Sequence, residues 1–226
     1  MNIINAPSLA NSSLLDMREQ TRQLAEGGAD WFHVDIMDGH YVPNLCFPLR
    51  LIGELKAAYP HIAVDVHLMV ENPAAYIPKL ASQGADYISF HLDATRFARR
   101  LLTDIKALGK KAGVALNPSQ SVDTAEPLAD LADYIVLMSV EPGYAGQVFM
   151  PEAIPRLARL VDLRARCGHP FLISIDGGID YENAAKCAQL GAEIFVTGVF
   201  TVFNQPEGLA EANARFKQRV LAKIDG

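Results

Sequence analysis

The sequence predicts an α/β protein that folds as a single (β/α)8 TIM barrel over residues 1–226. Three observations predict this fold. Short apolar segments alternate with longer helical patterns along the whole chain, as expected for parallel strands joined by crossover helices. There are eight segments of each kind, which is the number that closes a barrel. The chain length suits one barrel, and no Pro/Ser-rich or low-complexity linker divides it.

The predicted strands are short apolar runs, and the predicted helices lie between them. We expect strands at residues 3–8, 31–37, 63–69, 87–91, 111–116, 134–139, 171–176 and 194–197. We expect helices at residues 14–26, 48–58, 74–83, 97–108, 121–131, 151–167, 181–190 and 207–223. A doubly wound open sheet is the alternative topology, although the first strand lacks the Gly-x-Gly-x-x-Gly turn of a dinucleotide-binding fold.

A Gly-Ala-acid sequence recurs between a predicted helix and the strand that follows it. It reads Gly28-Ala29-Asp30, Gly84-Ala85-Asp86 and Gly191-Ala192-Glu193. Glycine just past a helix can take the left-handed conformation that closes the helix C-terminus. The recurrence indicates repeated strand and helix units.

Composition and charge favour a soluble cytoplasmic protein that binds neither nucleic acid nor a membrane. The net charge of −6 and the pI near 5.5 argue against the basic surface of a nucleic-acid binder. The three cysteines, Cys46, Cys167 and Cys187, are widely spaced, which favours a reducing cytosol and matches no metal-ligand spacing. No apolar run approaches the roughly 20 residues of a membrane span.

Two predicted strands carry metal-binding side chains on one face. Side chains alternate along a strand, so every second residue points the same way. The shared faces carry His33, Asp35 and Met37 on one strand and Asp65, His67 and Met69 on the next. A later strand ends in Asp176, which is followed by two glycines.

Because the C-terminal ends of barrel strands meet at one mouth, we expect His33, Asp35, His67 and Asp176 to converge there. Any one of them could be a hydrogen-bonded core residue, but the four together favour a metal site. Two imidazoles and two carboxylates suit one divalent metal cation, Zn, Fe(II), Mn or Co, with positions left for a substrate. Asp65 lies earlier on its strand, so we expect it to orient His67 without binding the cation.

The two carboxylates of this set suggest a proton transfer. Asp35 and Asp176 lie on well-separated strands and can face each other across a substrate. One carboxylate can remove a proton next to a carbonyl, and the other can return a proton to the opposite face of the same carbon. A cation stabilises the oxygens of the enediolate between these steps. We therefore predict Asp35 and Asp176 as the catalytic pair.

Glycine turns after the last two strands predict a phosphate site. Gly177 and Gly178 follow the seventh strand and Gly198 follows the eighth, where such barrels commonly hold an anion with backbone amides. Another glycine-bearing turn, residues 141–147, belongs to a loop at 142–149 that could close over the mouth as a lid.

Other residues near the predicted mouth are less specific. Met37, Met69 and Met138 end predicted strands, and two interpretations stay open for them: filling space, or excluding water from the reacting carbon. We expect His91, at the end of the fourth strand, to be a hydrogen-bonded rim residue. We expect Asp38 and Asn44 to serve turns.

Several long motifs follow one another along the chain: Ala6-Pro7-Ser8, HVDIMDGHYVPN, DVHLMVENP, GVALNP, VEPGYAGQVFMPE and IDGGI. Together they resemble the ribulose-phosphate 3-epimerase family. The resemblance implies a (β/α)8 barrel of the ribulose-phosphate-binding type. It also implies an isomerase that interconverts D-ribulose 5-phosphate and D-xylulose 5-phosphate, with one divalent metal cation, a phosphorylated ketose as its partner and a homo-oligomeric state, either a dimer or a hexamer.

The resemblance also implies roles for individual residues. It gives His33, Asp35, His67 and Asp176 as metal ligands, with Asp35 as the proton acceptor and Asp176 as the proton donor for one direction. It implies substrate contacts at Ser8, His67, Gly143, Tyr144, Ala145, Gly146, Gly177, Gly178, Gly198 and Val199.

The chain departs from the family pattern at three places. Ala145 replaces a glycine of the usual lid sequence, and Ser174 stands where the family usually has glutamate. The last phosphate turn usually reads Gly-Ser or Gly-Thr, whereas Val199 follows Gly198, so a hydroxyl donor is missing. The lid and the ending VFNQPEGLAEA resemble the D-allulose 6-phosphate 3-epimerase branch, which makes that activity, or another ketose-phosphate 3-epimerisation, the alternative.

Two rival classes remain. Phosphate-barrel decarboxylases use an Asp-x-Lys-x-x-Asp arrangement, but neither HVDIMDG nor DVHLMV contains lysine. A non-catalytic sugar-phosphate binder is suggested by the altered phosphate turn alone.

Overall fold

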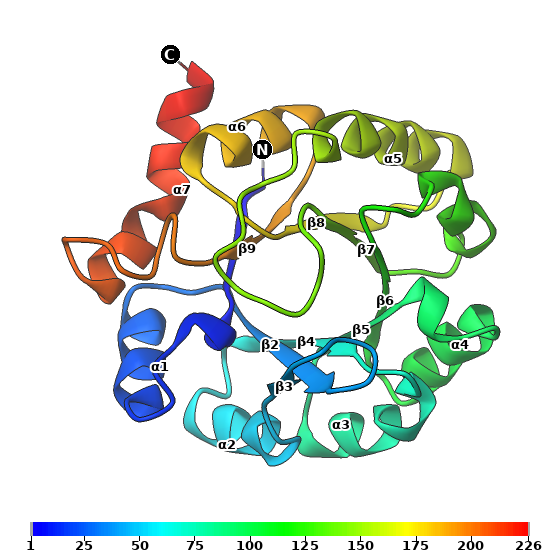
Figure 1. Ribbon diagram of the computed structural model, residues 1–226, viewed down its shortest axis with the longest axis horizontal. Coiled ribbons are helices and arrows are strands. Elements are labelled where there is room, and N and C mark those ends of the chain that lie inside the picture. Colours follow the sequence, from blue (N-terminus) through cyan, green and yellow to red (C-terminus); the bar gives the residue numbers. More distant parts are fainter. Residues whose placement is uncertain (1, 226) are drawn as a thin grey trace.

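The computed structural model describes residues 2–225, which form one nine-stranded sheet curled into a barrel (Figure 1). Eight strands form the barrel wall: β1 (Ile4–Pro7), β2 (Trp31–Asp38), β4 (Ala63–Met69), β5 (Tyr87–His91), β6 (Lys111–Leu116), β7 (Tyr134–Met138), β8 (Leu172–Asp176) and β9 (Ile194–Thr197). These eight strands pair in parallel, whereas β3 (Leu45–Cys46) runs antiparallel to the end of β2.

The predicted (β/α)8 barrel is confirmed, and the open-sheet alternative is wrong. The first barrel strand, β1, pairs with the last, β9, from Ile4 and Ile194 onward. A parallel bridge between Ser8 and His33 then joins the end of β1 to β2 and closes the ring.

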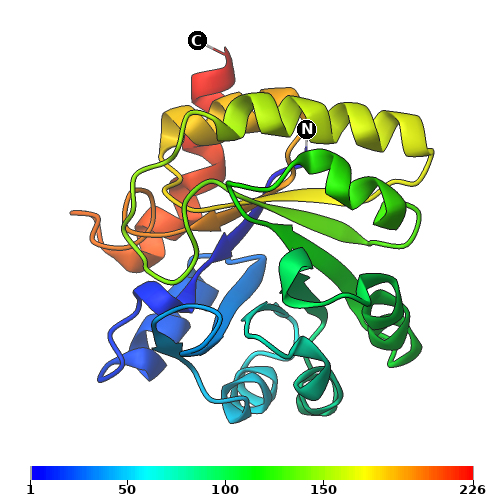
Figure 2. The ribbon, with the colours of Figure 1, turned by 45° about the vertical axis from the view of Figure 1, so that its right-hand side comes forward.

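Helices surround the strands on every side, as Figures 1 and 2 show. They are α1 (Met17–Glu26), α2 (Arg50–Ala58), α3 (Ile77–Gln83), α4 (Ala98–Ala107), α5 (Ala153–Cys167), α6 (Tyr181–Leu190) and α7 (Leu209–Asp225). Four short 3₁₀ segments accompany them: η1 (Leu9–Asn11), η2 (Pro73–Ala75), η3 (Leu92–Ala94) and η4 (Val122–Leu128). No helix among residues 2–225 combines the length and the apolar character needed to cross a membrane.

One predicted helix has a different form. The sequence predicts an α-helix over residues 121–131, but the segment forms the 3₁₀ helix η4. Pro127 lies inside it, and proline lacks the N–H group that an α-helix needs at this point. The Ser121 side chain caps the start of η4 by accepting a hydrogen bond from the Asp123 N–H. The crossover therefore keeps its place with a tighter, shorter helix.

The glycines of the recurring Gly-Ala-acid sequence end helices as predicted. Gly84 ends α3 with φ +97° and Gly191 ends α6 with φ +115°, both in the left-handed region. Gly28, two residues past α1, has φ +73°. Each helix is thus turned back toward the next strand.

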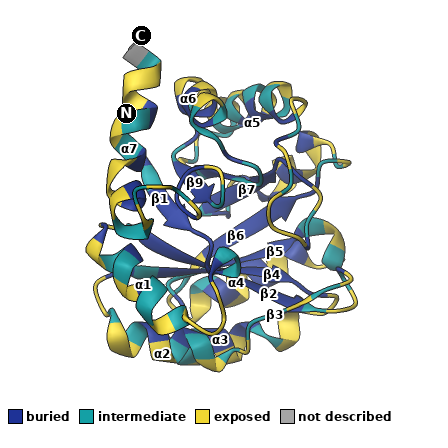
Figure 3. Ribbon diagram, turned by 60° about the vertical axis from the view of Figure 1, so that its left-hand side comes forward, coloured by how far each residue is buried: buried dark blue, intermediate teal, exposed yellow. Residues whose placement is uncertain are grey.

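The strands separate two cores. Side chains that point outward, such as Val34 and Val64, are fully buried against the helices. Inside the barrel, Trp31 stacks on Tyr87 with ring centroids 4.0 Å apart, and Tyr134 meets Tyr87 edge-on at 5.6 Å. Figure 3 shows the strands as the buried centre of the molecule. The aromatic layer fills the N-terminal half of the barrel interior, so a polar site is left at the C-terminal end.

Candidate active site

Four side chains from β2, β4 and β8 converge at the C-terminal end of the barrel. His33 Nε2 lies 3.3 Å from Asp35 Oδ1 and 3.6 Å from Asp176 Oδ2. His67 Nδ1 lies 3.4 Å from Asp35 Oδ1 and 3.3 Å from Asp176 Oδ2. One ligand atom from each residue falls within 4.8 Å of all the others. The sequence prediction that these four residues meet is confirmed.

The donor set fits a divalent cation. His33 Nε2 and His67 Nδ1 are buried and have no hydrogen-bond partner within residues 2–225, although buried polar atoms are normally satisfied. Both atoms face the carboxylates of Asp35 and Asp176. Two imidazole nitrogens and two carboxylate oxygens are ligands that Zn, Fe(II), Mn and Co accept. The four residues could therefore hold one such ion.

The site shifts the pKa values of its own members. Burial lowers the pKa of His67, but the neighbouring carboxylates of Asp176 and Asp35 outweigh it and raise that pKa to about 9. Burial and the same carboxylates act likewise on His33, whose pKa lies well above its usual value. Burial raises the pKa of Asp35 and of Asp176, but the imidazoles hold both pKa values below the usual range. A metal cation must therefore displace protons from the imidazoles to bind.

A hydrogen-bonded chain supports His33 from behind. His33 Nδ1 lies 2.8 Å from Asp65 Oδ2, and the Tyr134 hydroxyl donates to Asp65 Oδ1 at 2.6 Å. The Tyr134 ring passes over Gly113, where a Cβ atom would lie 2.4 Å from the ring. The prediction that Asp65 orients His67 is wrong, because the β2–β4 register places Asp65 opposite His33 and Asp35 opposite His67.

His67 has a different partner, His91 at the end of β5. The two Nε2 atoms are 2.8 Å apart, and both side chains are fully buried. The prediction of a rim position for His91 is therefore wrong. Burial first, and then the neighbouring His67, hold the pKa of His91 well below its usual value. His91 is an interior residue whose ring stacks beside the predicted cation ligand.

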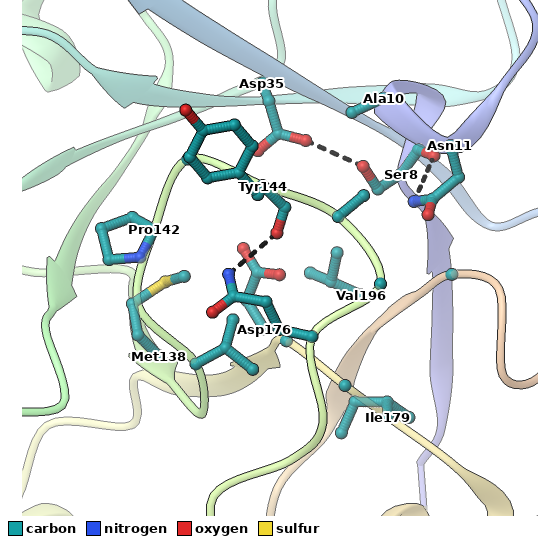
Figure 4. A pocket seen from close by; sticks show the side chains of 18 of the residues that line it. Ser8, Ala10, Asn11, Asp35, Met138, Pro142, Tyr144, Asp176, Ile179 and Val196 are labelled. Carbon is teal, nitrogen blue, oxygen red and sulfur yellow. Dashed lines mark hydrogen bonds between the residues drawn. The ribbon is translucent and has the colours of Figure 1, made fainter. Parts of the chain in front are cut away.

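A cavity of about 600 Å³, a volume that includes space open to solvent, lies above the four residues. Asp35 and Asp176 line it from different sides, as Figure 4 shows, whereas neither imidazole lines it. His67 is fully buried and does not line this cavity, so the structure does not place it in contact with a substrate there. Ser8 does line it, and its hydroxyl donates to Asp35 Oδ2 at 2.8 Å.

The three methionines predicted near the mouth all line the cavity. Met37, Met69 and Met138 are between 3% and 9% exposed, so each contributes to the cavity wall while remaining almost wholly buried. Met37 and Met69 also pack with Val42. They both fill space and form an apolar wall beside the carboxylates.

Backbone N–H groups gather at the far wall of the cavity. Gly177, Gly178, Gly198 and Val199 line this wall, and within residues 2–225 the N–H groups of Gly178, Gly198 and Val199 donate no backbone hydrogen bond. Gly178 has φ +61°, and a Cβ atom there would lie 2.3 Å from the Phe149 nitrogen. Unpaired backbone donors at the ends of β8 and β9 are the arrangement that holds an anion in barrels of this kind.

The loop predicted as a lid crosses the barrel mouth in Figure 1. Gly143, Tyr144, Ala145 and Gly146 line the cavity from this loop. The Asn44 side chain donates to the Gly143 carbonyl at 2.9 Å, and the Tyr144 hydroxyl donates to the Pro43 carbonyl at 2.8 Å. Asn44 also accepts from the Leu45 N–H, so it serves its own turn as expected and ties down the lid as well.

Asn11 is a cavity residue that sequence patterns did not single out. It lies in η1 and donates to the Ser8 carbonyl at 3.2 Å (Figure 4). Its amide also lies beside Gly198, where a Cβ atom would be 3.3 Å from it. Only its position just after the first strand could have pointed to it, because the loops at strand ends form the mouth.

Comparisons of sequence agree with this site. The model of the ribulose-phosphate 3 epimerase family matches residues 4–203. The chain is 41% identical over 193 residues to the ribulose-phosphate 3-epimerase of Aquifex aeolicus, covering 85% of this chain and 86% of that protein. It is 38% identical over 215 residues to the ribulose-phosphate 3-epimerase of Synechocystis, covering 94% of this chain and 92% of that protein.

Comparisons of structure agree on the fold. A crystal structure of KGPDC from Streptococcus mutans matches with a TM-score of 0.74 at 16% identity, covering 99% of both chains. The 3-hexulose-6-phosphate synthase from Salmonella typhimurium matches with a TM-score of 0.73 at 16% identity, covering 99% of this chain and 100% of the other. At this identity the likeness shows a shared barrel.

Proposed function

The chain belongs to the ribulose-phosphate 3-epimerase family and is thus an isomerase, and we propose that it interconverts D-ribulose 5-phosphate and D-xylulose 5-phosphate. The observation that carries this proposal is the placement of Asp35 and Asp176, which line one cavity from different strands. Epimerisation at a carbon next to a carbonyl requires a proton to leave one face and another to arrive on the opposite face. Two carboxylates on separate walls supply both positions.

In the proposed reaction, Asp35 accepts the proton from C3 of the ketose, and the bonding electrons pass into an enediolate. Asp176 then delivers a proton to C3 from the other side, which inverts the configuration. The two residues exchange roles in the reverse direction. The Ser8 hydroxyl, which donates to Asp35 Oδ2, holds the Asp35 carboxylate in position and leaves Oδ1 to face the imidazoles.

We propose that His33, Asp35, His67 and Asp176 hold one divalent cation. A bound cation supplies Lewis-acid stabilisation of the negative charge that develops on substrate oxygens. The orphaned nitrogens of His33 and His67 and the compact donor set support this assignment.

The rest of the cavity suits the other end of the substrate. The backbone N–H groups of Gly177, Gly178, Gly198 and Val199 would bind the phosphate. The lid would close over the sugar from above, with Tyr144, Ala145 and Gly146 against it. Met37, Met69 and Met138 would keep water from the enediolate.

One departure makes a six-carbon ketose phosphate the second candidate. Val199 packs partly against the hydrophobic core and offers no hydroxyl to the phosphate. A D-allulose 6-phosphate 3-epimerase would use the same two carboxylates and would place its phosphate one carbon farther from C3. We further propose that residues 1–226 form one domain and that the protein is a cytoplasmic homo-oligomer.

The test is a panel of five- and six-carbon ketose phosphates, followed by NMR in D₂O with the metal-loaded protein. We expect deuterium to enter C3 of ribulose 5-phosphate as xylulose 5-phosphate appears. Faster exchange on a six-carbon ketose phosphate would establish the second candidate. Failure to exchange the C3 hydrogen of every ketose phosphate in the panel would overturn both.

A further inference from the structure

Behind the predicted cation ligands, one short contact joins two imidazoles. His67 Nε2 and His91 Nε2 lie 2.8 Å apart, and neither side chain is exposed. Two imidazole nitrogens at this distance form a hydrogen bond only when one of them carries a hydrogen and the other does not. The proposed proton transfer makes no use of His91, so its role must come from how this bond is directed.

The direction of the bond is set at a carboxylate farther along. Asp93 Oδ1 accepts from the Tyr41 hydroxyl at 2.8 Å, and Asp93 Oδ2 accepts from Asn117 Nδ2 at 3.0 Å. Asn117 Nδ2 also donates to the Tyr41 oxygen at 2.7 Å. Both hydrogens of the Asn117 amide are therefore used on this side, and its Oδ1 is left as an acceptor on the other side.

The orientation of the Asn117 amide bears on which ring nitrogen of His91 carries the hydrogen. Two buried atoms near this point, Asn117 Oδ1 and His91 Nδ1, have no hydrogen-bond partner within residues 2–225. An amide oxygen can only accept, so a hydrogen on His91 Nδ1 is the arrangement that would satisfy both atoms. His91 Nε2 then accepts from His67 Nε2, and the lone pair of His67 is left on Nδ1. That is the atom that lies 3.3 Å from Asp176 and 3.4 Å from Asp35.

We propose that His91, Asn117 and Asp93 are positioning residues that fix His67 as the tautomer able to bind a divalent cation through Nδ1. This inference rests on the proposed function, since it takes His67 as a cation ligand. The chain of side chains is held by its surroundings as well, because Arg156 donates to the Asn117 carbonyl at 2.6 Å. The Tyr41 ring also lies over His91, with centroids 4.8 Å apart.

The test compares His91→Leu with His91→Gln. Leucine removes the acceptor for His67 Nε2, whereas Gln offers a side-chain oxygen that can accept the same hydrogen. Binding of Mn²⁺ or Zn²⁺, measured by calorimetry or chelator competition, should weaken by about 10- to 100-fold in His91→Leu and recover most of the way in His91→Gln. His61→Leu, which removes an exposed histidine, is the matched control and should bind the cation as the wild type does.

The loss of cation affinity should also become smaller from His91 through Asn117 to Asp93. Asn117 is 8% exposed, so Asn117→Leu should weaken cation binding nearly as much as His91→Leu. Asp93 is exposed, and water can replace its carboxylate as the acceptor, so Asp93→Asn should have the smallest effect. A role in folding alone would instead lower the melting temperature of the metal-free variants in the order of burial, with no rescue of cation affinity by Gln.

Nitrogen-15 NMR of the metal-loaded wild type provides a second measurement that needs no variant. We expect His67 to carry its hydrogen on Nε2 and to bind the cation through Nδ1. Cation binding through Nε2, an unchanged affinity in a folded His91→Leu, or equal losses in the Leu and Gln variants would overturn the proposal. Wild type that binds the cation without exchanging C3 hydrogens would overturn the proposed reaction alone, and wild type that binds no cation would overturn both.

Discussion

The two ends of the barrel use acidic residues in opposite ways. At the N-terminal end, each acid accepts the backbone N–H of a neighbouring strand and pairs with a base. The N–H acceptors are Asp30 for Asn5, Asp86 for Val64, Asp133 for Ala112 and Glu193 for Ile173, at 2.7 to 2.9 Å. The bases are Lys217, Lys56, Lys111 and Arg164, respectively. At the mouth, the ion-pair partners of Asp35 and Asp176 within residues 2–225 are the histidines.

The difference separates stability from chemistry. The acids of the N-terminal end have complete sets of partners, so they stabilise the ladder between strands and leave nothing free to react. The acids of the mouth share two imidazoles whose inner nitrogens are orphaned, an arrangement that costs stability unless a cation joins it. An Asp→Asn change should therefore lower kcat at the mouth and lower the unfolding free energy at the N-terminal end.

Asp176→Asn should give the largest effect. The amide cannot carry a proton between solvent and C3, so we expect kcat to fall by at least about 10²–10⁴-fold. The fold should survive, because Asn keeps the size of Asp and can still accept a hydrogen bond. Stopped-flow or coupled assays would measure kcat, and calorimetry would measure the melting temperature. Turnover like that of the wild type would contradict the assignment of Asp176.

Gly113→Ala tests whether interior packing reaches the cation site. A Cβ atom there would lie 2.4 Å from the Tyr134 ring, whose hydroxyl orients Asp65 and, through it, His33. We expect a loss of about 1–3 kcal/mol in unfolding free energy, together with weaker cation binding.

Tyr134→Phe is the control for that change, because it keeps the ring and removes only the hydrogen bond to Asp65. We expect it to weaken cation binding at a smaller cost in unfolding free energy than Gly113→Ala. If Gly113→Ala is destabilised but binds the cation like the wild type, then the packing of Tyr134 does not reach the site.

Asp133→Asn is the counterpart at the N-terminal end. Burial raises the pKa of Asp133, but the Ala112 N–H and the ammonium groups of Lys111 and Lys106 outweigh it and lower that pKa. We expect the variant to lose about 0.5–1.5 kcal/mol of unfolding free energy at pH 7, with kcat unchanged.

The pH dependence of this loss has a definite sign. The native pKa of Asp133 lies below its unfolded value of about 4, so its contribution is complete above that value and disappears as pH falls through the native pKa. Denaturant titrations at pH 7 and pH 3 should therefore show the gap between wild type and Asp133→Asn narrowing in acid. If the difference in unfolding free energy widens in acid, or if Asp133→Asn greatly lowers kcat, then the acids at the N-terminal end do not serve stability alone.

The sequence could predict which face of each strand carries the chemistry but not which neighbour each side chain meets. Side-chain direction alternates with a period of two residues along β2 and β4. This period predicts that His33, Asp35 and His67 lie at the same mouth of the barrel as Asp176, and the structure has them together. The partner of Asp65 depends on the register between β2 and β4, which no periodicity within one strand encodes. His91 was missed for a related reason, since its burial depends on how Tyr41 and Asn117 close over it.

In the recurring Gly-Ala-acid sequence, the role of the glycine can be predicted from the sequence, but the role of the acid cannot. The glycine could be assigned, because helix ends need a left-handed residue. The acid that follows it ties its own strand to the preceding one, as Asp86 does for Val64, and this contact exists only once parallel strands lie side by side. The two-residue β3 was too short to show any alternation.

Val199→Ser should give the smallest effect, and it tests the mouth where the chain departs from its relatives. The turn at Gly198 and Val199 lines the cavity with unpaired N–H groups, and serine would add a hydroxyl donor to them. One further hydrogen bond to a bound phosphate should lower KM by about 2- to 10-fold, with kcat nearly unchanged. Inhibition by inorganic phosphate should tighten in parallel, whereas an unphosphorylated ketose should show no change. An unchanged KM would mean that the phosphate binds away from this turn. The assignment of Asp35 and Asp176 as proton carriers would then stand, but the phosphate end of the substrate would have to be placed elsewhere in the cavity.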